Sequence, residues 1–238
     1  MGVSRGSGAA PGALSGTTTI ATGSSARGVC ISADGASVYA ANVSASTVSI
    51  FTRNTSTGAL SGTTTIATGS SPFGVCISAD GKNVYAANSG GATVSIFTRN
   101  TTTGALSGTT KIATGSTPYS VCISADGASV YAANFSSSTV SIFTRNTTTG
   151  ALSGTTTIAT GSSPFGVCIS ADGKNVYATN NASSTVSIFT RNTSTGALSG
   201  TTTIATGSFP VGVCISADGK NVYAANSGGA TVSIFTRS

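Results

Sequence analysis

The sequence contains no histidine, no tryptophan and no glutamate, and only 7% of its 238 residues are charged. Soluble domains usually carry about a quarter of charged residues. The absence of histidine excludes a His-based catalytic triad and a His metal site, and the absence of glutamate excludes acid–base pairs that include Glu. Few groups could therefore activate a nucleophile near neutral pH, and we predict a protein that is not an enzyme.

Long apolar runs are also missing, so no stretch is long enough to form a transmembrane helix. The first eleven residues contain one arginine and no apolar segment, which excludes an intact signal peptide in this chain. We expect a soluble protein without a membrane span, and the compartment stays open. Solubility then depends on Ser, Thr, Asn and Gly instead of charge.

The net charge is +6, but the 11 basic residues recur at regular spacing and form no run. Nucleic-acid binding needs Lys and Arg gathered on one face. We therefore predict no nucleic-acid partner, and nothing in the sequence calls for a cofactor.

The chain consists of repeats. The string GALSGTT begins at a strict period of 46 residues, at Gly12, Gly58, Gly104, Gly150 and Gly196. Periods of 20 to 50 residues are typical of solenoids and propellers, in which each unit completes its core against its neighbours. We predict a leader at 1–11, expected to be flexible, and one domain at 12–238, with repeats at 12–57, 58–103, 104–149, 150–195 and 196–238.

The second repeat contains four strand-like segments rich in Val, Ile, Thr, Tyr and Phe, separated by Gly, Pro, Asn and Asp. These segments are Ala59 to Thr68, Gly74 to Ser78, Asn83 to Ala87 and Thr93 to Arg99. The Asp80-Gly81 pair predicts a tight hairpin turn, because both residues tolerate positive φ. Four antiparallel strands in about 46 residues are typical of one propeller blade.

The segment from Gly69 to Thr98 resembles the YVTN-type, lactonase-like β-propeller repeat: the Pro-x-Gly-Val entry, the Ser-x-Asp-Gly turn, the Val-Tyr-x-x-Asn strand and the Thr-Val-Ser strand all match. The resemblance implies an all-β, five-bladed propeller whose strands run from inner A to outer D. The chain then begins with an outer strand, Leu14 to Thr22, and ends on a C strand, Thr231 to Arg237. We expect the N-terminal outer strand to close the last blade.

The only acidic residues are one aspartate per repeat, in the A-to-B turn: Asp34, Asp80, Asp126, Asp172 and Asp218. Turn chemistry explains them, and a ring of carboxylates that binds a cation is the alternative. Five arginines end the C strands on the same rim, and we expect them to neutralise the aspartates. They are Arg53, Arg99, Arg145, Arg191 and Arg237.

Cysteine and tyrosine also recur once per repeat. An odd set of equivalent thiols, Cys30, Cys76, Cys122, Cys168 and Cys214, cannot all pair within the chain, so we predict free buried thiols that act as small hydrophobes. The tyrosines of the B strands are predicted core residues. We therefore assign no catalytic residue.

The repeats differ mainly in the D-to-A and B-to-C loops, which share one face of a propeller, whereas the C-to-D loops are nearly unchanged. Drift after amplification of one blade explains this pattern as well as selection for a ligand does. The variable face carries an aromatic and polar set suited to stacking and hydrogen bonding. We predict ligand contacts from Arg27, Phe73, Tyr119, Phe135, Phe165 and Phe209.

Three functional hypotheses follow. The first is a non-enzymatic binding or display scaffold that recognises a glycan or a peptide on the variable face. The second is a structural propeller, recently amplified or designed, without a specific ligand. The third is a lactonase-like hydrolase, which we predict to be inactive because no acid, base or metal residue can be carried over. We expect a monomer, with strand-swapped or larger assemblies as the alternative.

Overall fold

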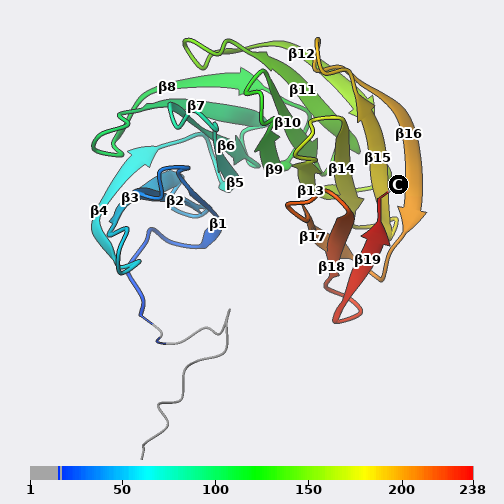
Figure 1. Ribbon diagram of the computed structural model, residues 1–238, viewed down its shortest axis with the longest axis horizontal. Coiled ribbons are helices and arrows are strands. Elements are labelled where there is room, and N and C mark those ends of the chain that lie inside the picture. Colours follow the sequence, from blue (N-terminus) through cyan, green and yellow to red (C-terminus); the bar gives the residue numbers. More distant parts are fainter. Residues whose placement is uncertain (1–15, 17, 238) are drawn as a thin grey trace, which may run out of the picture.

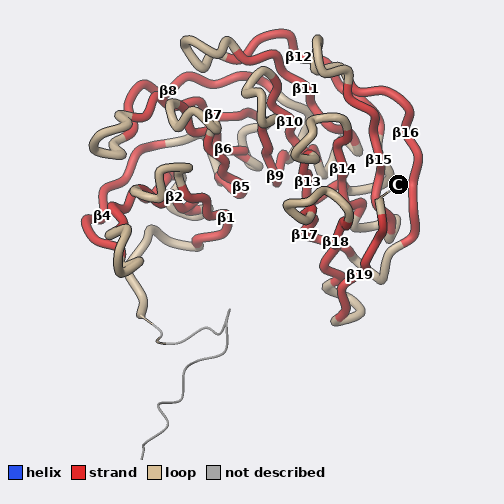
Figure 2. Tube along the Cα trace, viewed as in Figure 1, coloured by secondary structure: helices blue, strands red, loops and turns tan. Residues whose placement is uncertain are grey.

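The computed structural model describes residues 16 and 18–237 and contains strands, turns and loops (Figure 2). The leader at 1–11 and the start of the predicted N-terminal strand, residues 14, 15 and 17, lie outside the described residues. No helix occurs between residue 18 and residue 237, so this part of the chain offers none that could cross a membrane.

The protein is a five-bladed β-propeller, and each blade is an antiparallel sheet whose strands follow the chain in order. The first two blades consist of β1 (Ala26–Ile31), β2 (Ser37–Asn42), β3 (Thr47–Arg53) and β4 (Leu60–Ala67), and of β5 (Pro72–Ile77), β6 (Asn83–Asn88), β7 (Thr93–Arg99) and β8 (Leu106–Ala113). The third and fourth consist of β9 (Pro118–Ile123), β10 (Ser129–Asn134), β11 (Thr139–Arg145) and β12 (Leu152–Ala159), and of β13 (Pro164–Ile169), β14 (Asn175–Asn180), β15 (Thr185–Arg191) and β16 (Leu198–Ala205).

The last blade has three described strands, β17 (Pro210–Ile215), β18 (Asn221–Asn226) and β19 (Thr231–Thr236). The place of its outer strand is left for an N-terminal segment, as the repeat arithmetic predicts. The five blades follow one another in an arc, with the first and last blades at its two ends (Figure 1). The first strands of successive blades, β1, β5, β9, β13 and β17, line its inner side, in keeping with the inner-A to outer-D order that the resemblance implies.

The core lies in the seams, by which we mean the interfaces between consecutive blades. In the first seam Tyr39 and Ile50 of blade 1 pack against Val84, Phe97 and Leu106 of blade 2. The second and third seams repeat this cluster. A blade is therefore apolar on both faces, which explains why its B and C strands show no alternation of apolar and polar residues.

Local turn chemistry matches the repeat pattern. In each A-to-B hairpin a serine hydroxyl and a backbone N–H donate to the aspartate, as Ser32 (2.5 Å) and Ala36 (2.9 Å) do to Asp34. Gly35 follows at φ 67°, which glycine adopts without steric cost. The D-to-A loop pairs with the B-to-C loop of the same blade, for example from Ser89 N–H to Ser71 O at 2.9 Å, so the two variable loops share one face.

Candidate functional site: an axial pocket on the variable face

The second residue of each inner strand lies at the axis of the arc, on the variable face. A pocket of about 490 Å³ opens there, and all five of these residues line it. The pocket is lined by Arg27, Gly28, Phe73, Tyr119, Ser120, Phe165, Gly166, Val167, Val211, Gly212 and Val213. The five repeats, which are nearly uniform elsewhere, thus place a variable residue of each inner strand around one pocket.

Three aromatic rings, those of Phe73, Tyr119 and Phe165, line this pocket. The ring centroids of Phe73 and Tyr119 are 4.6 Å apart, and those of Tyr119 and Phe165 are 4.9 Å apart. Phe135, from the B-to-C loop of blade 3, adds its ring at 5.0 Å from that of Tyr119. The tilted and edge-on arrangements are those that aromatic quadrupoles favour. The cluster offers flat apolar faces beside one phenolic hydroxyl.

Arg27 supplies the positive charge of the pocket. Its guanidinium carbon lies 5.5 Å from the centroid of the Phe73 ring, a cation–π distance. None of the five aspartates forms an ion pair with Arg27. The guanidinium can therefore donate to an anionic or carbonyl oxygen of a ligand.

Two further polar residues, Ser120 and Thr179, replace the Gly and the Ala that all four other repeats have at these positions. The Ser120 hydroxyl lines the pocket and accepts the Val167 N–H at 3.3 Å, across the seam. Thr179 is fully buried behind the wall, accepts the Gly166 N–H and donates to Val211 O, both at 2.9 Å. These bonds fix the strands β13 and β17 that carry the wall.

Of the six predicted ligand contacts, five lie in this cluster and one does not. Phe209 is 53% exposed and its ring covers Gly228 in the B-to-C loop of blade 5, away from the axial aromatics. The residue after the proline points to the axis, whereas Phe209 precedes its proline. Val211 is the residue that sequence reasoning missed, although its place in the repeat is that of Phe73.

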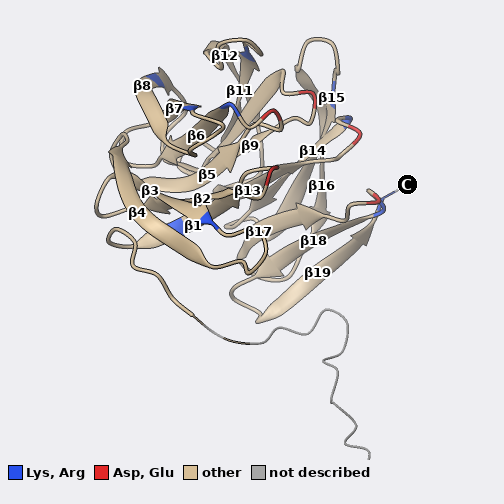
Figure 3. Cartoon of the chain, turned by 60° about the vertical axis from the view of Figure 1, so that its left-hand side comes forward, with Lys and Arg blue, Asp and Glu red and all other residues tan. Residues whose placement is uncertain are grey.

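The opposite rim carries the aspartates, and they are held by arginines of the following blade. Asp34 Oδ2 lies 2.9 Å from Arg99 Nη2, and the same pairing joins Arg145 to Asp80, Arg191 to Asp126 and Arg237 to Asp172. Figure 3 shows the acidic turns in red with basic residues in blue near them. Hydrogen bonds from Ser32 and Ala36, with Arg99, lower the pKa of Asp34 to about 2. No cluster of three metal-ligating groups occurs within 18–237.

The arginine of each pair is the centre of a larger contact, which we call the seam latch. In the first three seams it includes a tyrosine of the preceding blade, whereas Arg237 in the fourth seam donates to Gly219 O, Asp172 and Asn175. Arg99 is buried; its Nε donates to the Tyr39 hydroxyl at 2.7 Å, and Tyr39 in turn donates to Gly104 O at 2.8 Å. Blades 2 and 3, and blades 3 and 4, are joined in the same way through Tyr85 and Tyr131. Burial raises the pKa of Tyr85 to about 12, so the latch tyrosine stays a neutral hydroxyl.

The cysteines are free, and four are partly buried while Cys214 is exposed. Burial raises the pKa of Cys30 and of Cys168 to about 12. These two thiols are therefore protonated near neutral pH and unsuited to nucleophilic attack.

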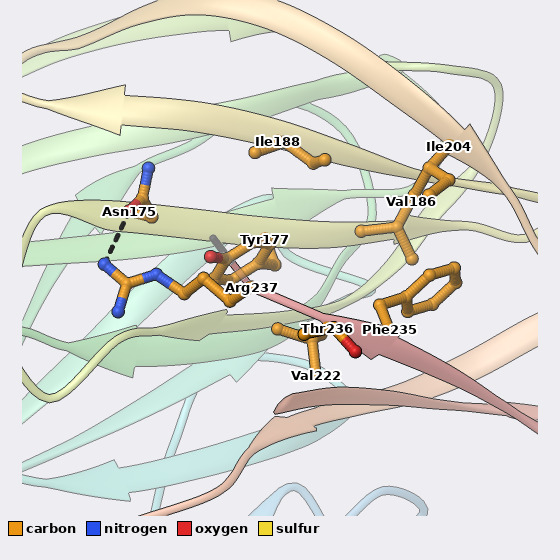
Figure 4. A pocket seen from close by; sticks show the side chains of 9 residues that line it. All are labelled: Asn175, Tyr177, Val186, Ile188, Ile204, Val222, Phe235, Thr236 and Arg237. Atoms are coloured by element: carbon orange, nitrogen blue, oxygen red, sulfur yellow. Dashed lines mark hydrogen bonds between the residues drawn. The ribbon is translucent and has the colours of Figure 1, made fainter. Parts of the chain in front are cut away.

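A second cavity, of about 200 Å³, lies in the fourth seam, between blades 4 and 5 (Figure 4). Its walls include Tyr177, Ile188, Val222 and Phe235. In the first three seams a leucine from the outer strand of the following blade takes this place: Leu106, Leu152 and Leu198. The cavity in the fourth seam is thus the space of a missing side chain and belongs to the core.

Comparison with known proteins identifies the family. The family model of the lactonases, described as a seven-bladed β-propeller, matches residues 63–168 and 156–238. The chain belongs to this lactonase family. No protein with a curated description matches the chain in sequence.

Several solved structures share the fold of the chain. One is the periplasmic gluconolactonase of Pseudomonas aeruginosa, with a TM-score of 0.76 and 20% identity over 87% of this chain and 65% of that chain. A protein of Bacteroides uniformis, provisionally assigned as a 6-phosphogluconolactonase, gives 0.77 and 23% over 87% and 66%. A protein of Lactobacillus plantarum gives 0.80 and 21% over 90% and 67%. The chain described here thus spans about two thirds of the length of these structures.

Membership of the family corrects two predictions. The prediction of a non-enzymatic scaffold for glycans or peptides, and with it the prediction that the protein is not an enzyme, is wrong, because the match is to a family of lactonases. The missing histidine and glutamate excluded particular catalytic groups. They did not exclude hydrolysis that depends on hydrogen-bond donors and positive charge, which the axial pocket contains.

Proposed function

We propose that the protein is a lactonase-like hydrolase that binds a sugar lactone in the axial pocket. The observation that carries this proposal is the convergence of Arg27, Tyr119, Ser120 and the aromatic rings on one pocket in a member of a lactonase family. A sugar ring has apolar C–H faces and polar edges, and stacks on aromatic side chains while its hydroxyl groups form hydrogen bonds.

In this reaction a water oxygen bonds to the carbonyl carbon, the bond from that carbon to the ring oxygen breaks, and a water proton passes to the ring oxygen. Negative charge develops first on the carbonyl oxygen. The Arg27 guanidinium can stabilise that charge, because donors in a partly dehydrated pocket act strongly on a developing oxyanion. The Tyr119 hydroxyl can donate to the ring oxygen as its bond breaks.

In this proposal no side chain acts as a base on the attacking water, and solvent water takes up its proton. Lactones are esters held in a strained geometry and hydrolyse in water without an enzyme, so a site that orients the ring and stabilises the oxyanion accelerates the reaction without a side-chain base. The named relatives suggest gluconolactone, with or without a 6-phosphate, as the first substrates to test. Arg27 favours the form that carries the additional negative charge.

The test is proton release from gluconolactone and its 6-phosphate in a pH-stat, with spontaneous hydrolysis subtracted. We expect Arg27→Ala to lower kcat/KM about tenfold or more, as the loss of a charge-assisted hydrogen bond does. Tyr119→Phe should lower it through kcat. Phe209→Ala is the matched control, since Phe209 belongs to the same variable loops but lies outside the pocket, and should leave kcat/KM within about twofold. Turnover that these pocket variants leave unchanged would place the reaction elsewhere.

A further inference from the structure

The two ends of the arc expose apolar surface that every other blade buries. On β1, Val29 is 67% exposed, whereas its equivalents in blades 2, 3 and 4 are buried. On β19, Val232 and Ile234 are 57% and 69% exposed, whereas Val48 and Ile50 of blade 1 are buried in the first seam. The face of blade 1 and the face of blade 5 are therefore the two halves of one more seam.

The charges of these two faces are complementary, as they are in the four existing seams. Each seam latch joins an aspartate of one blade to an arginine of the next, and four of these pairs are formed. Arg53 of blade 1 pairs with none of the five aspartates, and Asp218 of blade 5 has no arginine or lysine within ion-pair distance in the described chain. Tyr223 likewise has no hydrogen-bond partner among residues 18–237, while Tyr39 has two.

The segment before β1 follows the course of an outer strand that belongs to a preceding blade. The Thr63 hydroxyl donates to Ala21 O at 3.4 Å, just as the Thr109 hydroxyl of blade 2 donates to Ala67 O of blade 1 at 3.5 Å. Residues 14–21 have the sequence LSGTTTIA, identical to β4 and β12. A blade 5 placed beside blade 1 would thus meet the segment around Ala21 in the place that the end of β4 takes beside blade 2.

We propose that this blade 5 belongs to a second copy of the chain, so that the protein assembles head to tail through a fifth seam of the same kind. The five blades form an open arc in which blades 1 and 5 stay apart (Figure 1), whereas the family model describes a propeller of seven blades. Blade 5 of a second copy can pack against blade 1 without any change in the four existing seams. Arg53 of one copy pairs with Asp218 of the other, and Val29 covers Val232 and Ile234.

This contact joins two different faces, so it is heterologous and leaves one free face at each end of a dimer. Ten blades exceed one turn at the spacing of the arc. The assembly therefore either rises along its axis as a helix or widens into a ring of two copies, and both forms bury the apolar ends.

Cys214 is a built-in reporter for the contact, because it lies on the exposed face of blade 5 and its equivalents lie inside seams. Native thiol titration with DTNB and the mass from light scattering should be measured over about three decades of protein concentration. We expect one fast-reacting thiol and a monomer mass at low concentration, and a protected thiol with larger masses at high concentration. A reactive Cys214 and a monomer mass throughout, or a protected thiol in a monomer at every dilution, would overturn the proposal.

Charge reversal tests the same contact without a thiol. Arg53→Asp and Asp218→Arg should each weaken self-association about tenfold or more, because like charges then meet in the seam. An equal mixture of the two variants should restore assembly, because each variant complements the other at both of its ends. Lys220→Ala is the control, since it removes an exposed charge next to Asp218 without a latch role. Failure of the mixture to assemble would refute the second copy as the partner.

Discussion

Replacing Arg145 by methionine should destabilise the fold by about 3 kcal/mol, near the lower end of the 3–5 kcal/mol that follows removal of one partner of a buried ion pair. The side chain is 1% exposed. Its Nε donates to Tyr85, its Nη1 to Gly127 O and its Nη2 to both Asp80 and Asn83. Asp80 is one third exposed and water can solvate it after the change, which keeps the cost near 3 kcal/mol.

The matched control for this experiment is Arg53→Met. Arg53 ends the same strand of blade 1 but donates only to Gly35 O, at 3.0 Å, and forms no ion pair. We expect a cost below about 1 kcal/mol. Urea unfolding at a concentration where the mass is that of the monomer measures both, and with a slope of about 1–3 kcal/mol/M the Arg145 variant should lose about 1 M or more in midpoint. Equal losses for the two variants would refute the seam latch as a source of stability.

Three further predictions concern the same seams. Tyr85→Phe should cost about 1–2 kcal/mol because it removes the hydroxyl between Arg145 and Gly150 O, whereas Tyr223→Phe should cost almost nothing in the monomer; chemical unfolding compares them. The free energy of unfolding should fall as pH rises above 9 and through about 12, because the folded pKa of Cys30 and Cys168 is raised and the unfolded chain releases these protons first; Cys30→Ala should reduce the slope. Stability should persist above pH 4 and fall as pH drops towards 2, because the folded pKa of Asp34 lies near 2; Asp34→Asn should flatten this acid limb.

The blade could be predicted from the sequence because its signals are local. The strand at Thr93 to Arg99 has the predicted bounds, and the inner strand, predicted from Gly74, begins two residues earlier at Pro72. The Asp-Gly turn and the shared face of the variable loops also follow from the repeat. Each of these depends on residues within one repeat, where turn chemistry and strand propensity determine the outcome.

The pairing of arginines with aspartates on one rim was predicted, but the tyrosine of the seam latch and the details of the pocket could not be predicted in the same way. Tyr39 meets Arg99 only because two blades stack, and no periodicity in the sequence specifies that contact. The proline-flanking positions were equally ambiguous: Phe73 points to the axis and Phe209 does not, although both are aromatic residues next to the equivalent proline of their repeats. The catalytic class was misjudged because composition reveals missing groups but not the collective effect of those present.

The seam latches have a consequence for how the molecule melts. Each links only consecutive repeats, so the free energy of the chain resembles that of a one-dimensional array with nearest-neighbour coupling, five units and four couplings. The terminal units have one neighbour each and should fray first, and lengthening the array by one unit should add one coupling. Such a molecule can change its number of repeats during evolution without redesigning any interface, which is a freedom that a globular core with long-range contacts lacks.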